Sequence, residues 1–417
     1  MTNPPGATPT PPPAIHHDPW LTTRQGSPLA SLAADIWACI ERFLSSGRKP
    51  RTDAVERRRA IVQNLAANLA ILAIRYPLGH RLAVQAYKQA KTRYDRPDFP
   101  RGLLMEIIGE MEAAGWIIRY PGVSRKLRTT LVPTSRFLDM IRASRISSDD
   151  IDRVPGGETI ALKAVVGRNR PKLLINFEDT PETRQLRSEM EKVNAAINAA
   201  DVRLDGRPQP PTHMVRVFLI DGPEAPHVFT KHGRLFRGFW EHLQRERRGG
   251  LTIGGEPLVE LDYRAMYLHL AYASQGVPVP AGDPYAIPGL EGYRGGAKKA
   301  VSALFFRDGP MLRLTGELRD MLPEGWTAQR LQEAVAAHHP ALVPVLNANI
   351  GPTLANTESR ILVAVLLRLL DEGIVALPIH DCLLVPVGVK DAALMAMREE
   401  SARIVGVAIP VGEKPTA

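Results

Sequence analysis

The sequence predicts an α+β protein in which a mostly helical first half precedes an antiparallel sheet packed with helices. Residues 54–74 carry apolar side chains at helical spacing and are rich in strong helix formers. Residues 372–387 contain two apolar, β-prone runs on either side of one charged pair, which is the pattern of a hairpin. A short apolar strand at 259–261 precedes a helical pattern at 265–273, and together these segments predict the sheet and its covering helices.

The composition of the chain indicates which partners and which cell compartment to expect. The chain has 417 residues, a formal charge of +9 and a pI of about 9.6, which favours a polyanionic partner. No apolar run reaches the roughly 18 residues that a membrane span needs, and the first residues lack the pattern of a signal peptide. The two cysteines lie far apart and give no disulfide framework. We therefore expect a cytoplasmic protein with no membrane partner, and the sequence does not indicate its oligomeric state.

The region before residue 150 divides into a tail and a helical domain. Residues 1–25 are rich in proline and poor in aliphatic side chains, which predicts a disordered tail. Within 28–150 we expect the helix at 54–74, a second helix over 79–91 and a third that ends near Gly115.

Two strands around a basic loop, at 116–120 and 127–132, follow these helices, and this order is that of a winged helix. The predicted wing carries Arg119, Arg125, Lys126 and Arg128, which suit contacts to phosphates. The alternative is a small helical domain with a solvated basic hairpin.

Residues 155–226 form a connecting region with one clear helix start. Thr180 suits the N-cap position and Pro181 suits the first helical position. The apolar residues that follow at helical spacing are Leu186, Met190, Val193 and Ile197. Residues 214–220 read as a strand.

Two aspartates in the remaining part of the chain, 227–417, are candidate metal ligands. Asp262 ends the strand at 259–261 and precedes a helix, and Asp381 lies in the charged pair of the predicted hairpin. An Asp in so apolar a stretch needs a partner that offsets its desolvation. Two carboxylates that converge from different strands are what a two-metal phosphoryl-transfer site requires.

A helix predicted between the two aspartates carries cations on one face. Arg294 and Lys298 are four residues apart, and Phe306 lies roughly on the same face. Two cations and one aromatic ring suit a triphosphate with a base stacked beside it.

With these motifs in this order, residues from about 228 to 390 resemble the family A (DNA polymerase I-like) DNA polymerases and their relatives, the phage single-subunit RNA polymerases. The matched motifs are Asp262-Tyr263 after a strand, the R-x-x-x-K helix followed by an aromatic residue, His380-Asp381 on a hairpin, and Gly233-Arg234-Leu235 upstream. The resemblance implies a right-hand polymerase palm with helical fingers over 227–417 and a thumb-like role for 155–226. The short interval between the two aspartates implies that the fingers are reduced.

The resemblance also implies roles for these residues. Asp262 and Asp381, with the backbone carbonyl of Tyr263, would bind two Mg²⁺ ions, with Mn²⁺ as an alternative. Arg294 would hold the incoming triphosphate, and Lys298 would neutralise or protonate the leaving pyrophosphate.

Other motif residues would contact the substrates. Phe306 would stack beside the nascent base pair, Arg234 would contact the primer end in the minor groove, and His380 would support the primer terminus. The implied partners are a DNA primer-template and dNTPs.

Several positions depart from the pattern of the family. Tyr267 replaces a Glu, Phe306 replaces a Tyr, Ser302 replaces a Phe, and Cys382 stands where a Glu would give the metal site a further polar neighbour. The sequence has no D-x-E motif, so we expect no proofreading exonuclease. A bulky ring at Tyr267 would lie under the sugar of the nucleotide and favour dNTPs over rNTPs.

The leading prediction is a template-directed DNA polymerase of a mobile element or a bacterium, used in DNA replication. Three alternatives remain open at this stage. One is a primase or RNA polymerase on the same palm, and another is a non-catalytic replication initiator that binds DNA and keeps a decayed palm. The last is a metal-dependent His-Asp phosphohydrolase, which would need further ligands at helical spacing.

Overall fold

The computed structural model describes residues 12–44, 52–85, 91–122, 128–167 and 170–414. It is a mixed α+β structure that forms two compact units. The first unit comprises residues 1–158 with 207–211, and the second comprises 159–206 with 212–417. Among the described residues, no helix is both long enough and apolar enough to span a bilayer.

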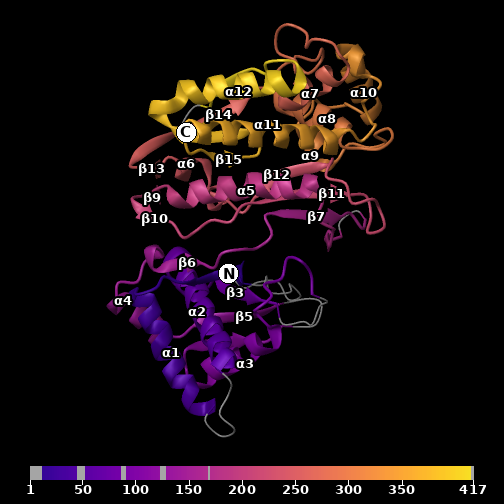
Figure 1. Ribbon diagram of the computed structural model, residues 1–417. Helices are drawn as coiled ribbons and strands as arrows, with labels where there is room; N and C mark the ends of the chain where they lie inside the picture. The colour runs from indigo at the N-terminus through magenta and orange to yellow at the C-terminus, as the bar shows by residue number, and fades with distance from the viewer. Residues whose placement is uncertain (1–11, 45–51, 86–90, 123–127, 168–169, 415–417) are drawn as a thin grey trace, which may run out of the picture. The chain divides into compact units, whose positions relative to one another are not determined.

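The first unit contains four helices among its described residues, drawn in indigo and purple in Figure 1. These are α1 (Pro28–Leu44), α2 (Thr52–Arg75), α3 (Arg101–Ala113) and α4 (Ser135–Ala143). Its sheet has the strand order β1-β3-β5-β4, with β1 (Ala14–His16) parallel to β3 (Arg81–Val84) and β5 (Thr129–Pro133) antiparallel to both β3 and β4 (Ile117–Tyr120). A second, two-stranded sheet pairs β2 (Leu21–Thr23) with β6 (Ile151–Arg153), which follows the 3-10 turn η1 (Ser148–Asp150).

Packing of the helices against the larger sheet forms the core of the first unit. Ile36 of α1, Leu65 of α2 and Ile107 of α3 are fully buried in one apolar cluster. Trp116 and Phe137 close the same cluster beside β4 and α4. The predicted helix at 54–74, the helix end near Gly115 and the two strands after it are confirmed.

Two expectations for the first unit are wrong in part. Residues 14–16 and 21–23 form strands rather than a disordered tail, because Asn64 and Asn68 of α2 hydrogen-bond to the backbone around Asp18. The helix predicted over 79–91 does not form at 81–84, which is the strand β3; residues 86–90 lie outside the described residues. Gly79 has φ +99°, which an α-helix does not allow, and the bonds of β3 to two neighbouring strands outweigh helix propensity.

The second unit contains two sheets and the long helix α11 (Gly351–Asp371). The first sheet has the order β12-β11-β7-β8, formed by β7 (Ile160–Ala164), β8 (Leu173–Ile175), β11 (Val215–Ile220) and β12 (His232–Phe236). The second runs β9-β13-β14-β16-β15, formed by β9 (Val202–Leu204), β13 (Leu251–Ile253), β14 (Glu256–Tyr263), β15 (Leu377–Ile379) and β16 (Cys382–Pro386). The strand β17 (Val411–Glu413) pairs with β14, and β10 (Arg207–Pro208) belongs to the first unit.

The other helices of the second unit are α5 (Pro181–Ala199), α6 (Arg245–Arg248), α7 (Met266–Ser274), α8 (Arg294–Phe305), α9 (Gly316–Asp320), α10 (Ala328–His338) and α12 (Lys390–Val405). Helices α5 and α12 contact the sheets, whereas α8 contacts α9 and α10. Short 3-10 turns lie at η2 (Phe239–His242), η3 (Pro340–Leu342) and η4 (Val387–Val389). Helix α11 contacts α12, α7, α5 and β12, so it runs through the middle of the unit (Figure 1).

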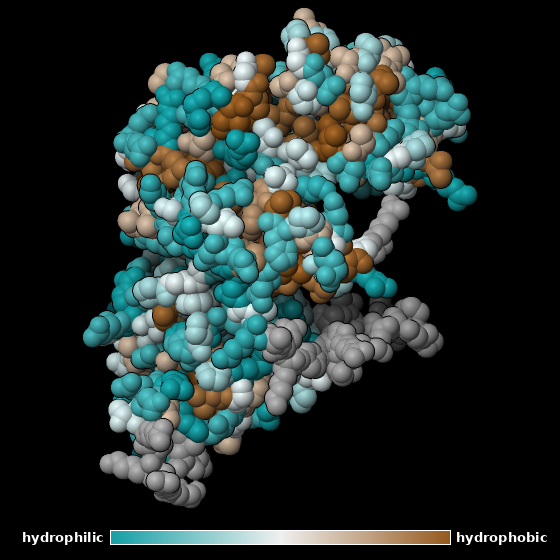
Figure 2. Space-filling view, turned by 45° about the vertical axis from the view of Figure 1, so that its right-hand side comes forward, coloured by the Kyte–Doolittle hydropathy of each residue, from teal (hydrophilic) through white to brown (hydrophobic). Residues whose placement is uncertain are grey.

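The predicted elements of the second unit are confirmed. Thr180 caps α5 by accepting a hydrogen bond from the Thr183 N–H, and Pro181 is the first residue of the helix. The strand at 214–220, the strand before Asp262 with the helix after it, and the hairpin around His380-Asp381 are all present. The face of this unit drawn in Figure 2 is mainly hydrophilic, with hydrophobic residues gathered in its upper part.

Candidate active site

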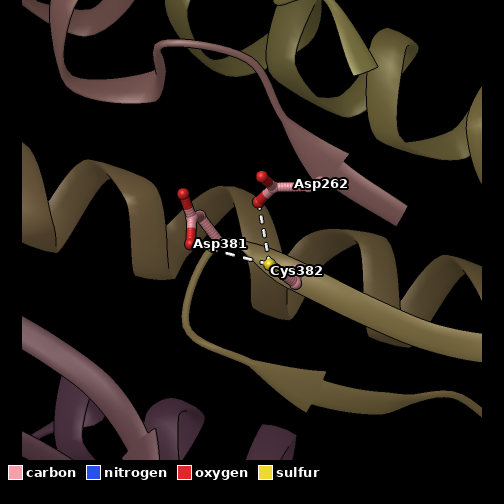
Figure 3. Close-up of side chains that lie close together, drawn as sticks. All are labelled: Asp262, Asp381 and Cys382. Atoms are coloured by element: carbon pink, nitrogen blue, oxygen red, sulfur yellow. Dashed lines mark hydrogen bonds between the residues drawn. The ribbon is translucent and has the colours of Figure 1, made fainter. Parts of the chain in front are cut away.

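Strand pairing brings Asp262 and Asp381 together. In the antiparallel pair of β14 and β16, Asp262 lies directly opposite Cys382, so the hairpin tip places Asp381 beside it. One ligand atom from each of Asp262, Asp381 and Cys382 lies within 4.8 Å of the others (Figure 3). The two aspartates that the sequence predicts as a pair therefore converge from different strands, as a metal site requires.

A tight turn fixes the position of Asp381. Ile379 pairs with Cys382, which leaves His380 and Asp381 as a two-residue loop with His380 at φ 54°, in the left-handed region that short hairpin loops use. The Tyr263 N–H donates to the Asp381 carbonyl at 3.4 Å and ties the loop to the end of β14. The His380 ring packs edge-on against Phe236 at 5.9 Å between centroids.

The electrostatics of the pair favour a cation. Burial raises the pKa of the Asp381 carboxyl, and the nearby charge of Asp262 raises it further. A divalent cation between the two carboxylates would offset both effects, and carboxylate oxygens are the ligands that Mg²⁺ prefers. The donor set therefore fits Mg²⁺ through its two carboxylates, whereas the thiol of Cys382 is a soft ligand that Mg²⁺ does not favour.

Cys382, which stands where the family pattern has a Glu, contacts both aspartates through its thiol. Its Sγ donates to Asp262 Oδ1 at 2.8 Å, and it lies 3.8 Å from Asp381 Oδ1. The amine of Lys414 donates to the same sulfur at 2.8 Å and lies 3.2 Å from Asp262 Oδ2. The sequence offered no signal for Lys414, because it is a single lysine more than thirty positions beyond the hairpin.

A buried ion pair stands beside the carboxylates. Arg234 of β12 binds Glu358 of α11 with two hydrogen bonds, at 2.6 and 3.0 Å, and the Glu358 side chain is only 2% exposed. The Arg234 guanidinium also donates to the hydroxyl of Tyr267. Sequence reasoning missed Glu358, which lies on the buried face of an apolar helix where a lone carboxylate gives no periodic signal.

Packing against a neighbouring ring explains why a glycine precedes Arg234. Gly233 has φ +92°, and a Cβ there would lie 2.8 Å from the ring of Phe218. Only glycine avoids that clash, so the Gly-Arg pair allows β12 to pass close to β11 and direct the arginine to α11.

A cavity of about 130 Å³ adjoins Asp381. Arg234, Tyr267, Lys298 and Glu358 line it together with Asp381, and part of its wall is apolar. Helix α8 supplies Lys298 and α7 supplies Tyr267, while β12, α11 and the β15–β16 hairpin supply the other three, so residues from five separate segments meet there. The arrangement places a carboxylate, a lysine, an arginine and a phenol around one small volume.

Arg294 and Phe306 lie at the two ends of α8 rather than in the wall of this cavity. Arg294 forms two hydrogen bonds to Asp283, at 2.6 and 3.0 Å, and its guanidinium lies 5.2 Å from the ring centre of Tyr285. The Phe306 ring meets Tyr267 edge to face at 5.5 Å. A Cβ at Gly351, the first residue of α11, would lie 2.4 Å from the Phe306 ring, so this contact needs glycine.

The predicted wing residues of the first unit are only partly described. Arg119 forms an ion pair with Glu112 at 2.7 Å, and the Arg128 guanidinium lies 3.0 Å from the His16 ring. Arg125 and Lys126 lie outside the described residues. Among the described residues, each of the two wing cations, Arg119 and Arg128, therefore contacts a neighbour within the chain.

Comparisons with known proteins do not show the family of this chain. No protein-family model and no curated protein matches the sequence. Among solved structures, the chain is similar to the POL domain of Pol1 from M. smegmatis in complex with a DNA primer-template and dNTP, at 13% identity and a TM-score of 0.27. The match covers 95% of this chain and 67% of that one, and at this TM-score it carries no argument about fold or function.

Proposed function

We propose that the second unit is a template-directed nucleotidyltransferase that extends a DNA primer with dNTPs, as a DNA polymerase without proofreading. The observation that carries the proposal is the convergence of Asp262 and Asp381 beside a cavity that Lys298, Arg234 and Tyr267 line. In this proposal β14, β15, β16 and β17 with α7 and α11 form the palm, and α8 to α10 form the reduced fingers.

Asp262 and Asp381, with the Tyr263 carbonyl, would hold two Mg²⁺ ions, or Mn²⁺ in their place. When bound, such ions neutralise the charge that develops during phosphoryl transfer and align the attacking and leaving oxygens. The raised pKa of Asp381 has the physical cause expected of such a site, because two carboxylates share a partly desolvated place. The tight turn at His380 holds Asp381 in position before any substrate binds.

The cations of α8 would act on the triphosphate. Lys298 already faces the cavity beside Asp381, where its amine would neutralise the leaving pyrophosphate or donate a proton to it. Arg294 would exchange its exposed ion pair with Asp283 for the triphosphate, a small cost because exposed pairs contribute little. Phe306 would stack beside the nascent base pair from its half-exposed place next to Tyr267.

Tyr267 would select the sugar. Its hydroxyl is held by Arg234 and its ring by Phe306, so the ring cannot swing away from an added 2′-hydroxyl without breaking both contacts. Overpacking of a tight site costs about 1–3 kcal/mol, which corresponds to roughly a tenfold to hundredfold preference for dNTPs. Arg234, with its plane fixed by Glu358, would contact the primer end, and His380 would support the terminus.

The first unit would deliver the enzyme to DNA. Its helix α3 followed by the β4–β5 hairpin, with β3 as a third strand, has the element order of a winged helix. Arg119, Arg125, Lys126 and Arg128 would contact phosphates, which gives affinity without sequence specificity.

Primer extension on a defined DNA template in Mg²⁺ tests the proposed function. The full chain should lengthen the primer with dNTPs and much less with rNTPs, and EDTA should stop both reactions. A preference for rNTPs would move the chain to the primase or RNA polymerase alternative. No extension with either set, together with DNA binding, would favour the non-catalytic initiator.

A further inference from the structure

A lysine amine lies against the carboxylate of Asp262 that the proposed reaction needs. The Lys414 Nζ lies 3.2 Å from Asp262 Oδ2, 3.0 Å from Glu260 Oε1 and 2.8 Å from Cys382 Sγ. The side chain is about one third exposed, so it is held at the edge of the site rather than free in solvent.

The backbone holds Lys414 in this place. Strand β17 pairs with the end of β14, and the Lys414 N–H donates to the Glu260 carbonyl at 2.9 Å. Glu260 and Asp262 are two residues apart on β14, so their side chains share one face of the sheet, and Lys414 reaches both. Glu260 also binds Arg248 at 3.0 Å, so the amine of Lys414 shares this carboxylate with a second cation.

Both oxygens of Asp262 therefore have partners within the chain. The thiol of Cys382 donates to Oδ1 and the amine of Lys414 contacts Oδ2. A divalent cation that binds Asp262 must take one of these oxygens and also meets the positive charge of the amine. Charges of like sign only a few ångströms apart near a protein surface repel strongly.

We propose that Lys414 is the internal counter-ion of Asp262 and that it competes with the divalent cation for this carboxylate. Metal binding shifts the amine toward Glu260, and the site binds the metal more weakly than its carboxylates alone would. The inference rests on the proposed function only in taking Asp262 as a ligand for a divalent cation.

Mn²⁺ binding tests this competition without any turnover. Free Mn²⁺ is measured by its paramagnetic resonance signal during titration of the wild type and of Lys414→Met, with circular dichroism to check folding. We expect Lys414→Met to lower the Kd for Mn²⁺ by about tenfold or more, since removing a cation beside a ligand favours the metal. Lys390→Met is the matched control, because Lys390 pairs with Glu413 of the same strand at 3.3 Å, and its Kd should equal that of the wild type. An unchanged or higher Kd in Lys414→Met would overturn the proposal.

A second measurement uses the wild type alone, in case Lys414→Met does not fold. Acetylation of lysines by an activated ester is followed by mass spectrometry with and without Mn²⁺. Labelling of Lys414 should speed up several-fold in Mn²⁺ while that of Lys390 stays constant, and a constant rate at Lys414 while Mn²⁺ is bound would contradict the displacement. Failure of the proposed function looks different, because the wild type would then bind Mn²⁺ but not extend a primer.

Discussion

The two units place their charged residues in different ways. In the second unit, charged side chains from β12, α8, α11 and the β15–β16 hairpin converge on one small cavity, and the carboxylate that α11 contributes is buried. In the first unit, the described cations of the predicted wing sit at the surface and each has a local partner. A buried convergence of unlike charges costs desolvation and therefore points to chemistry, whereas exposed cations point only to a solvated or a phosphate-binding face.

Substitution of either aspartate should have the largest effect, and this effect is on the rate of primer extension. Asp262→Asn or Asp381→Asn should reduce primer extension by at least about 10³-fold, because each removes a charge that the reaction needs. DNA binding should stay largely intact, because affinity comes mostly from basic residues. Extension and gel-shift binding are measured on the same preparations, and near-normal extension by either variant would refute the two-metal assignment.

The buried ion pair should matter more for stability than any exposed pair of the same unit. Glu358→Ala leaves the Arg234 guanidinium partly buried with its main partner removed, and we expect the free energy of unfolding to fall by about 3 kcal/mol. Arg247→Ala is the control, since its pair with Asp205 is more than half exposed and should contribute about 0–1 kcal/mol. Urea denaturation measures both free energies of unfolding. Equal losses in the two variants would show that the buried pair contributes no more to stability than the exposed pair.

The next prediction tests whether the ring of Tyr267 in the cavity wall selects the sugar of the nucleotide. Tyr267→Ala should raise rNTP insertion relative to dNTP insertion by roughly tenfold to hundredfold, because the ring no longer overlaps the 2′-hydroxyl. Single-nucleotide insertion kinetics give the ratio for both proteins. Tyr267→Phe is the control, since it keeps the ring and should keep most of the preference, so an unchanged ratio in Tyr267→Ala would exclude the ring as the gate.

Substitutions in the predicted wing of the first unit should have the smallest effect, and this effect is on DNA affinity. Changing Arg125, Lys126 and Arg128 together to Ala should flatten the dependence of DNA affinity on salt by up to about one unit of slope per lost phosphate contact. Fluorescence anisotropy of the full chain on duplex DNA, over a range of salt, measures the slope. A slope equal to that of the wild type would mean that the predicted wing does not touch phosphates.

The strands and the paired aspartates of the second unit could be predicted from the sequence because they follow from local apolar patterns. Asp262 and Asp381 stand out because each interrupts or ends an apolar run, and pairing of those two runs in one sheet brings the residues together. Lys414 and Glu358 could not be found in this way, since their partners come from tertiary contacts that leave no periodic pattern. The strand β3 was missed because its short apolar run fits a helix as well as a strand, and only pairing with β1 and β5 decides it.

Direction by a template separates the proposed polymerase from an enzyme that adds nucleotides without one. The most direct measurement offers the full chain, in Mg²⁺, one labelled primer annealed to four templates that differ only in the next base, with each dNTP supplied singly. We expect each template to select its complementary dNTP and Asp381→Asn to insert none. Insertion of the same nucleotide on all four templates, or no insertion by the wild type on any of them, would contradict this expectation.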